Sequence, residues 1–143
     1  MPFVEICDFT VDGVPIPQGS KNAWVSGAKA VMFDQNTKVL KPWRALVTAA
    51  AAEAHSGDRI EGPVLVVIEF RFGRPKSVKR EWPSVKPDID KLERALFDGI
   101  TDSGLWRDDA QVVQVSKKNV YAERPGVHVR VGEYRTPQKK REN

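Results

Sequence analysis

The segment that most restricts the fold is Val64–Phe72, nine residues that are mostly β-branched or aromatic. Such a composition predicts a strand buried in the core, because these side chains pack well on a pleated surface. The chain has 143 residues, which is enough for one compact domain around that strand. A buried strand needs other elements to cover it, so the flanking segments must supply helices or further strands.

Two segments show apolar residues at helical spacing. The first runs from Pro42 to His55, with proline at its start and Ser56-Gly57 at its end. The second runs through Leu92, Leu96 and Ile100 and ends around residues 99–103. We therefore expect one helix before the Val64–Phe72 strand along the chain and one helix after it.

The remaining expected elements are strands. A loop rich in proline and polar residues, 14–26, leads into a short strand expected near Ala30–Phe33. Two valine-rich runs, 112–115 and 127–131, predict two more strands joined through residues 123–126. The order is strand, hairpin, helix, strand, helix, strand, strand. It predicts an α/β or α+β fold: a single small domain, residues 1–134, with a mixed sheet of about four strands and two main helices. Residues 135–143 are expected to form a basic flexible tail.

Composition excludes several classes of protein. No stretch reaches the roughly 18 consecutive apolar residues of a membrane helix, and the first residues lack the pattern of a signal peptide. The single cysteine, Cys7, cannot form an internal disulfide and suits a reducing cytoplasm. With only His55 and His128 besides, the usual Cys/His zinc site is excluded, and no GxSxG motif indicates a serine hydrolase. Any catalysis would therefore depend on carboxylates.

The charges are strongly segregated along the chain. Residues 71–86 hold six basic residues and one acid, a net charge of +5, and residues 88–110 hold three basic residues and seven acids, a net charge of −4. Charge runs are usually solvated faces. Here, however, the acids are spaced like metal ligands, and the neighbouring loop would hold a polyanion. We call residues 71–86 the basic loop.

Two pairs of aspartates form the candidate site. Asp88 and Asp90 flank Ile89 where the second helix begins, and in an extended segment residues i and i+2 point to the same side. Asp108 and Asp109 follow the same helix, so the loop between must fold back for either to reach Asp88. Carboxylate oxygens with open positions for water and phosphate suit Mg²⁺ or Mn²⁺, which would polarise a phosphoryl oxygen and activate bound water.

Each of these residues also has a purely structural interpretation. Asp90 with Glu93 matches a helix-capping box, and Asp108 and Asp109 could be turn residues. Arg94, four residues after Asp90, could form a salt bridge with it or could stabilise charge on a scissile phosphate. Trp82 in the basic loop could stack on an unpaired base or could simply anchor the loop.

The motif KPDIDKLxRALFDGI, followed by GLWRDDAQVV, resembles the signature of the RusA-type Holliday-junction resolvases, small endonucleases common in phages and prophages. The match is strong over Lys86–Val115, about a fifth of the chain. The resemblance implies that Asp88, Asp90 and Asp109 bind the metal and that Arg94 stands where the family has a catalytic lysine. Lys91 replaces the usual asparagine after the second aspartate and would place another cation near the metal and the DNA.

The resemblance further implies a Mg²⁺-dependent homodimer that nicks two opposed strands of a four-way DNA junction, in the cytoplasm of a bacterium or phage-infected cell. Two alternatives remain open: a metal-dependent nuclease acting on other branched or single-stranded DNA, and a non-catalytic DNA-binding protein. A junction resolvase must accept many sequences, so the basic loop should contact phosphates. The residues expected to do so are Arg74, Lys76, Lys79, Arg80 and Lys86.

Overall fold

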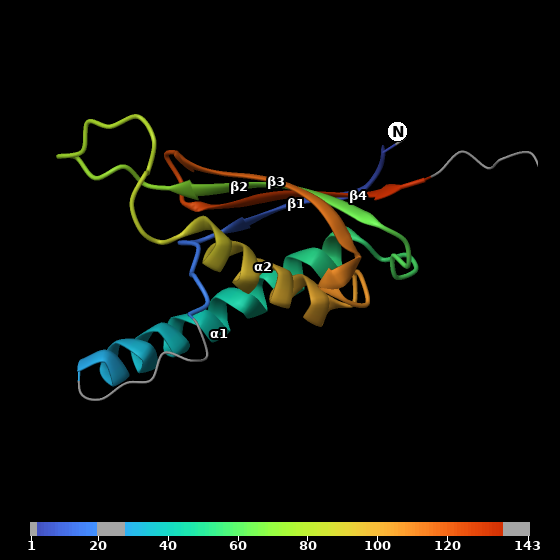
Figure 1. Ribbon diagram of the computed structural model, residues 1–143, viewed down its shortest axis with the longest axis horizontal. Coiled ribbons are helices and arrows are strands. Elements are labelled where there is room, and N and C mark those ends of the chain that lie inside the picture. Colours follow the sequence, from blue (N-terminus) through green and yellow to red (C-terminus); the bar gives the residue numbers. More distant parts are fainter. Residues whose placement is uncertain (1–2, 20–27, 136–143) are drawn as a thin grey trace, which may run out of the picture.

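A four-stranded sheet carries both long helices on one of its faces (Figure 1). The computed structural model describes residues 3–19 and 28–135. Its elements, in chain order, are β1 (Phe3–Asp12), α1 (Ala28–Ala54), β2 (Val64–Phe72), α2 (Ile89–Ser103), the short 3-10 helix η1 (Asp109–Gln111), β3 (Val112–Tyr121) and β4 (Gly126–Tyr134).

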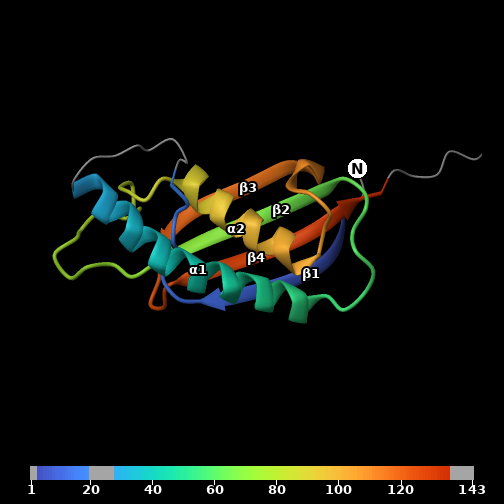
Figure 2. The same cartoon turned by 90° about the horizontal axis from the view of Figure 1, so that it is seen from below.

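The strands lie in the order β1-β4-β2-β3, which Figure 2 shows from the helix side. β2 is parallel to β3, and β4 is antiparallel to both β1 and β2. Parallel neighbours need a crossover connection, which α2 provides between β2 and β3. The predicted α+β fold with a mixed four-stranded sheet and two main helices is confirmed.

The alternation of residues along β2 decides which face carries the helices. Val64, Val66, Ile68 and Phe70 are at most 1% exposed, whereas the residues between them are half-buried on the other face. Strand side chains alternate between faces, so one face of β2 enters the core. The same core contains the following residues of the other elements: Cys7, Phe9, Val11, Trp43, Val47, Ala51, Leu92, Ala95, Leu96, Ile100, Val127, Val129 and Val131.

The two helices approach each other closely at Gly99 of α2. A Cβ placed there would lie 2.8 Å from Cγ1 and 2.9 Å from Cβ of Val47 on α1, so only glycine fits without displacement. The Thr48 hydroxyl donates a hydrogen bond of 2.8 Å to the Gly99 carbonyl at the same crossing. This contact fixes α2 against α1 and therefore fixes where α2 starts.

Two details of the expected secondary structure are wrong. Residues 30–33 are part of α1 and not a strand, and Pro42 lies inside α1 and does not begin it. Proline removes one backbone hydrogen bond, here to the carbonyl of Lys38. Lys38 and Pro42 are both exposed, so the loss falls on the solvent-facing side of the helix, and burial of Trp43, Val47 and Ala51 stabilises the helix after the proline.

The expected basic tail lies outside the described residues except for Arg135, whose Nε donates to Oε1 of Glu133 at 3.1 Å. No helix in the described part of the chain is long and apolar enough to cross a membrane.

Substituting Gly99 with alanine should lower the free energy of unfolding by about 1–2 kcal/mol. Overpacking against Val47 costs roughly 1–3 kcal/mol, which exceeds the gain of up to about 1 kcal/mol in helix propensity. Gly73→Ala is the matched control, because nothing lies within 4 Å of a Cβ built there. Urea unfolding of both variants measures the difference, and equal stabilities would contradict the close approach at Gly99.

Candidate active site

The start of α2 presents two carboxylates that make no capping hydrogen bond to the helix. Asp88 is the N-cap residue, with extended backbone angles of φ −68° and ψ 139°, and its side chain makes no capping hydrogen bond. Its only ion pair in the described part of the chain is with Nζ of Lys91, at 4.0 Å. Asp90 follows in the first turn, is exposed, and has no hydrogen bond or ion pair among the described residues. Both oxygens of Asp90 are therefore open to a ligand.

Two structural interpretations offered by the sequence, the Asp90–Glu93 capping box and the Asp90–Arg94 salt bridge, do not hold among the described residues. The helix is capped at Asp88 and not at Asp90, so the Asp90–Glu93 capping box does not form. Glu93 instead pairs with Nζ of Lys117 on β3 at 3.1 Å. Arg94 is exposed and forms no ion pair with the described side chains, those of residues 3–19 and 38–135. Its guanidinium therefore remains available to an anionic ligand.

Asp108 and Asp109, the second aspartate pair, have different surroundings. Asp108 caps η1, because its Oδ1 accepts from the Ala110 N–H at 2.9 Å in a capping box with Gln111. This is the turn function that the sequence allowed for Asp108. Asp109 is exposed, and partial desolvation, a hydrogen bond with Asp108 and the charges of Asp98 and Glu93 raise its pKa. Asp109 is thus surrounded by negative charge.

The charges that act on Asp109 come from Asp108 and from Asp98 and Glu93 of α2, whereas Asp88 and Asp90 lie at the start of that helix. Among the side chains that the structure describes, those of residues 3–19 and 38–135, no three or more aspartate, glutamate, histidine or cysteine side chains are close enough to hold one metal ion. The described part of the single chain therefore does not gather Asp88, Asp90 and Asp109 into one metal-binding cluster.

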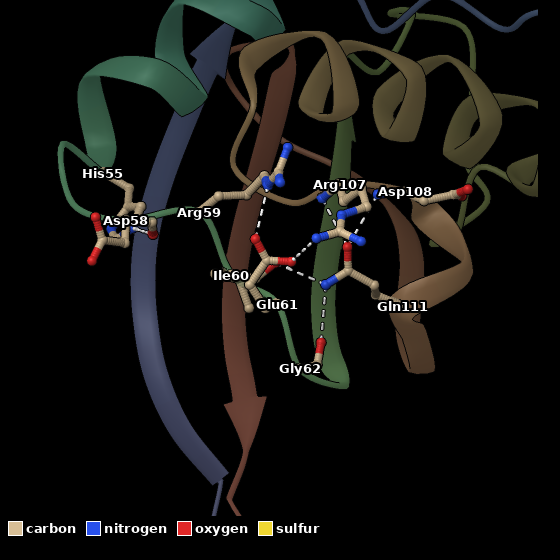
Figure 3. A network of polar contacts seen from close by, with 9 residues as sticks. All are labelled: His55, Asp58, Arg59, Ile60, Glu61, Gly62, Arg107, Asp108 and Gln111. Atoms are coloured by element: carbon tan, nitrogen blue, oxygen red, sulfur yellow. Dashed lines mark hydrogen bonds and ion pairs between the residues drawn. The ribbon is translucent and has the colours of Figure 1, made fainter.

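Gln111 is a residue of the site region that the sequence reasoning missed. Its Nε2 donates to the carbonyls of Ile60 at 2.8 Å and Gly62 at 3.1 Å, and its Oε1 accepts from the backbone N–H groups of Arg107 at 2.8 Å and Asp108 at 3.1 Å (Figure 3). One amide thus joins the loop before β2 to the turn that carries both aspartates. The available signal was its place two residues after Asp109 in the DDAQ motif.

Two further contacts hold the same turn. Glu61 accepts from Arg59 Nε at 3.1 Å and from Arg107 Nη2 at 2.8 Å (Figure 3). Trp106 is buried, packs edge-on against Phe97 with ring centroids 5.4 Å apart, and donates its indole N–H to Thr101 at 2.7 Å. The position of Asp109 is therefore set by packing and hydrogen bonds on both sides.

The basic loop leaves most of its cations free. Arg74 is partly engaged, since it donates to the Glu81 carbonyl at 3.3 Å and lies 4.9 Å from the centre of the Tyr121 ring. The other expected phosphate ligands in the loop are exposed and form no ion pair among the described residues; they are Lys76, Lys79, Arg80 and Lys86. Figure 1 shows the loop projecting from the end of β2, on the way to α2.

A model of endodeoxyribonuclease domains matches residues 12–132, so the class of protein is an endodeoxyribonuclease. That model is described as endodeoxyribonuclease RusA, and the chain belongs to the RusA family, whose members act on DNA junctions.

Two relatives support this assignment. An uncharacterized protein of Bacillus subtilis, YqaN, is 31% identical over 138 residues, covering 87% of this chain and 94% of YqaN. The crossover junction endodeoxyribonuclease RusA of Escherichia coli K12 is 58% identical over 26 residues, which is 18% of this chain and 22% of that protein.

Replacing Gln111 with glutamate should destabilise the protein by roughly 1–3 kcal/mol. The carboxylate keeps the shape but removes two donated hydrogen bonds and faces the carbonyls of Ile60 and Gly62. Gln114→Glu is the control, because among the described residues Gln114 only accepts a hydrogen bond, from the Tyr134 hydroxyl, and a carboxylate can do the same. Thermal unfolding tests the pair, and equal melting temperatures would show that Gln111 does not hold the turn.

Proposed function

We propose that this protein is a Mg²⁺-dependent endonuclease that resolves four-way DNA junctions by paired nicks, in the cytoplasm of a bacterium or phage-infected cell. One observation carries the proposal: two carboxylates free of capping duties, Asp88 and Asp90, lie at the start of α2 directly after a loop of charge +5. Membership of the RusA family supports the same conclusion.

The proposed metal ligands are Asp88, Asp90 and Asp109. Mg²⁺ commonly takes one or two protein carboxylates and completes its shell with waters and substrate phosphates, so the Asp88–Asp90 pair fits it chemically. In this proposal Asp109 joins once DNA and metal are bound, and Mn²⁺ can substitute for Mg²⁺. A bound metal would polarise the phosphoryl oxygen and lower the pKa of its water.

The remaining residues act on the DNA itself. Arg94, which is exposed and unpaired in the described part of the chain, would stabilise negative charge that builds up on the cleaved phosphate. Lys91, next to Asp88, would hold a neighbouring phosphate, and the basic loop would bind the phosphates of an approaching arm. These cations would attract a polyanion to a site whose own carboxylates would otherwise repel it.

The proposal includes a homodimer. One chain supplies one set of candidate carboxylates, whereas resolution requires two nicks in strands of like polarity. A two-fold dimer would present two sites related by the symmetry of the junction.

Asp90→Asn should lower the rate of four-way junction cleavage in Mg²⁺ by about 100-fold or more while leaving stability within ~1 kcal/mol of the original protein. Asparagine keeps the size of the side chain but is a poor Mg²⁺ ligand. Asp88→Asn and Asp109→Asn should behave alike, and Asp108→Asn should stay active because asparagine also caps well. The measurement compares four-way, forked and duplex DNA. An active Asp90→Asn variant, or equal cleavage of all three substrates, would contradict the proposal.

Changing Lys79 and Arg80 together to alanine should weaken junction binding and reduce the slope of log K against log[salt] by roughly one to two units, because two phosphate contacts are lost. Arg130 and Arg135, changed together to alanine, form the control. Both are exposed; Arg130 lies on β4 opposite Val67 in the middle of β2, and Arg135 directly follows β4 by the start of β2, at the end away from the basic loop. An unchanged slope for the Lys79–Arg80 variant would mean that the loop does not contact DNA.

A further inference from the structure

A surface pocket of about 480 Å³ opens between the end of the basic loop and the start of α2. Its volume falls within the range of small-molecule sites, roughly 300–1,000 Å³. Asp88 lines it, so the pocket borders one of the proposed metal ligands. Its other lining residues are Trp82, Pro83, Ser84, Val85, Lys86, Pro87, Ile89 and Asn119.

The wall formed by the basic loop carries two exposed apolar side chains. Trp82 is 54% exposed and Val85 is 51% exposed, and Pro83, which is buried, and Pro87, which is half-buried, also line the pocket. A tryptophan that anchored the loop would be mostly buried. The exposure of the Trp82 side chain therefore argues against the anchoring role. Lys86, also exposed, adds a cation to this apolar wall. The combination suits a ligand with a flat apolar part and an attached negative charge.

Asn119 of β3 supplies an amide to the pocket. It also lines an adjoining hollow of about 160 Å³, which shares Pro83, Val85, Lys86 and Pro87 with the larger one. Its Oδ1 is enclosed and has no hydrogen-bond partner among the described residues. An enclosed carbonyl oxygen without a donor is unfavourable, and rotation of the amide would let it donate to and accept from the edge of a base.

We propose that this pocket receives one unstacked nucleobase from the DNA strand, at the nucleotide beside the phosphodiester to be cleaved. The inference rests on the proposed function, because Asp88 would place the metal at the rim of the pocket. Trp82 would stack on the base, Lys86 would bind its phosphate, and the Asn119 amide would meet its edge. The positive charge of the basic loop favours this occupant over an uncharged or cationic one.

The test uses the full chain with Asp90→Asn, which keeps the DNA intact, and four-way junctions in which 2-aminopurine replaces one base at a time around the branch point. This fluorescent base reports loss of stacking in the duplex and stacking on tryptophan. We expect one position to change its fluorescence on binding. Trp82→Ala should abolish that change and weaken binding by roughly 5- to 150-fold, the range for losing one base–aromatic stack.

Three further variants separate stacking from folding and from readout. Trp82→Phe should keep the fluorescence change, because it retains an aromatic face. Val113→Ala removes another exposed apolar side chain, 63% exposed, that does not line the pocket, and it should leave both the fluorescence change and the binding as they are. Asn119→Ala should keep the change but reduce the preference for one base at the responding position.

The outcomes distinguish this inference from the proposed function. If no position responds, or if Trp82→Ala responds like the parent chain, the pocket does not hold a base, even where the protein with Asp90 restored cleaves four-way junctions. If a response dependent on Trp82 appears in a protein that fails to cleave junctions when Asp90 is restored, the base site stands and the resolvase proposal falls. Failure to bind DNA at all would overturn both.

Discussion

The burial of α2 over the core face of β2 is the contact on which the rest of the structure depends. Leu92, Leu96 and Ile100 of α2 share one hydrophobic core with Val66 and Ile68 of β2. Because this apolar stripe fixes the height and rotation of the helix, it also fixes where the polar ends of the helix lie. Asp88 and Asp90 occupy one end, and the turn with Asp108 and Asp109 follows the other.

The two acidic segments differ in how firmly their side chains are held. The turn before β3 is secured by the four hydrogen bonds of Gln111, by the two ion pairs of Glu61 and by the buried ring of Trp106. At the start of α2, by contrast, Asp90 and Arg94 have no partners among the described residues. A site that binds an ion and a charged substrate is expected to combine a firmly held backbone with unpaired charged side chains. Such a site needs little rearrangement of the protein when the ligand binds.

The distribution of charge suits the DNA substrate proposed for this site. The carboxylates of Asp88 and Asp90 would repel DNA unless cations stood beside them, and the basic loop leads through Pro87 to Asp88 at the start of α2. Loops on a rigid scaffold commonly carry such functions, because they can change length and charge without disturbing the core. Here the loop brings lysines and arginines, and it also brings Trp82 and the pocket that borders the proposed cleavage position.

The sequence by itself determined the strand Val64–Phe72, the helix through Leu92 and Ile100, the two valine-rich strands and the mixed sheet, because each depends on a local periodicity of apolar residues. It also singled out the four aspartates, through their spacing and their resemblance to the RusA motif. It misplaced residues 30–33 and the start of α1, because Pro42 lies inside a helix that burial of its apolar face stabilises, so the proline does not mark where the helix begins. Only the tertiary structure decided that Gln111 joins two loops about 50 residues apart and that Asn119 of β3 lines a pocket with Trp82. These are contacts between distant segments, and they exist only after the core has brought the segments together.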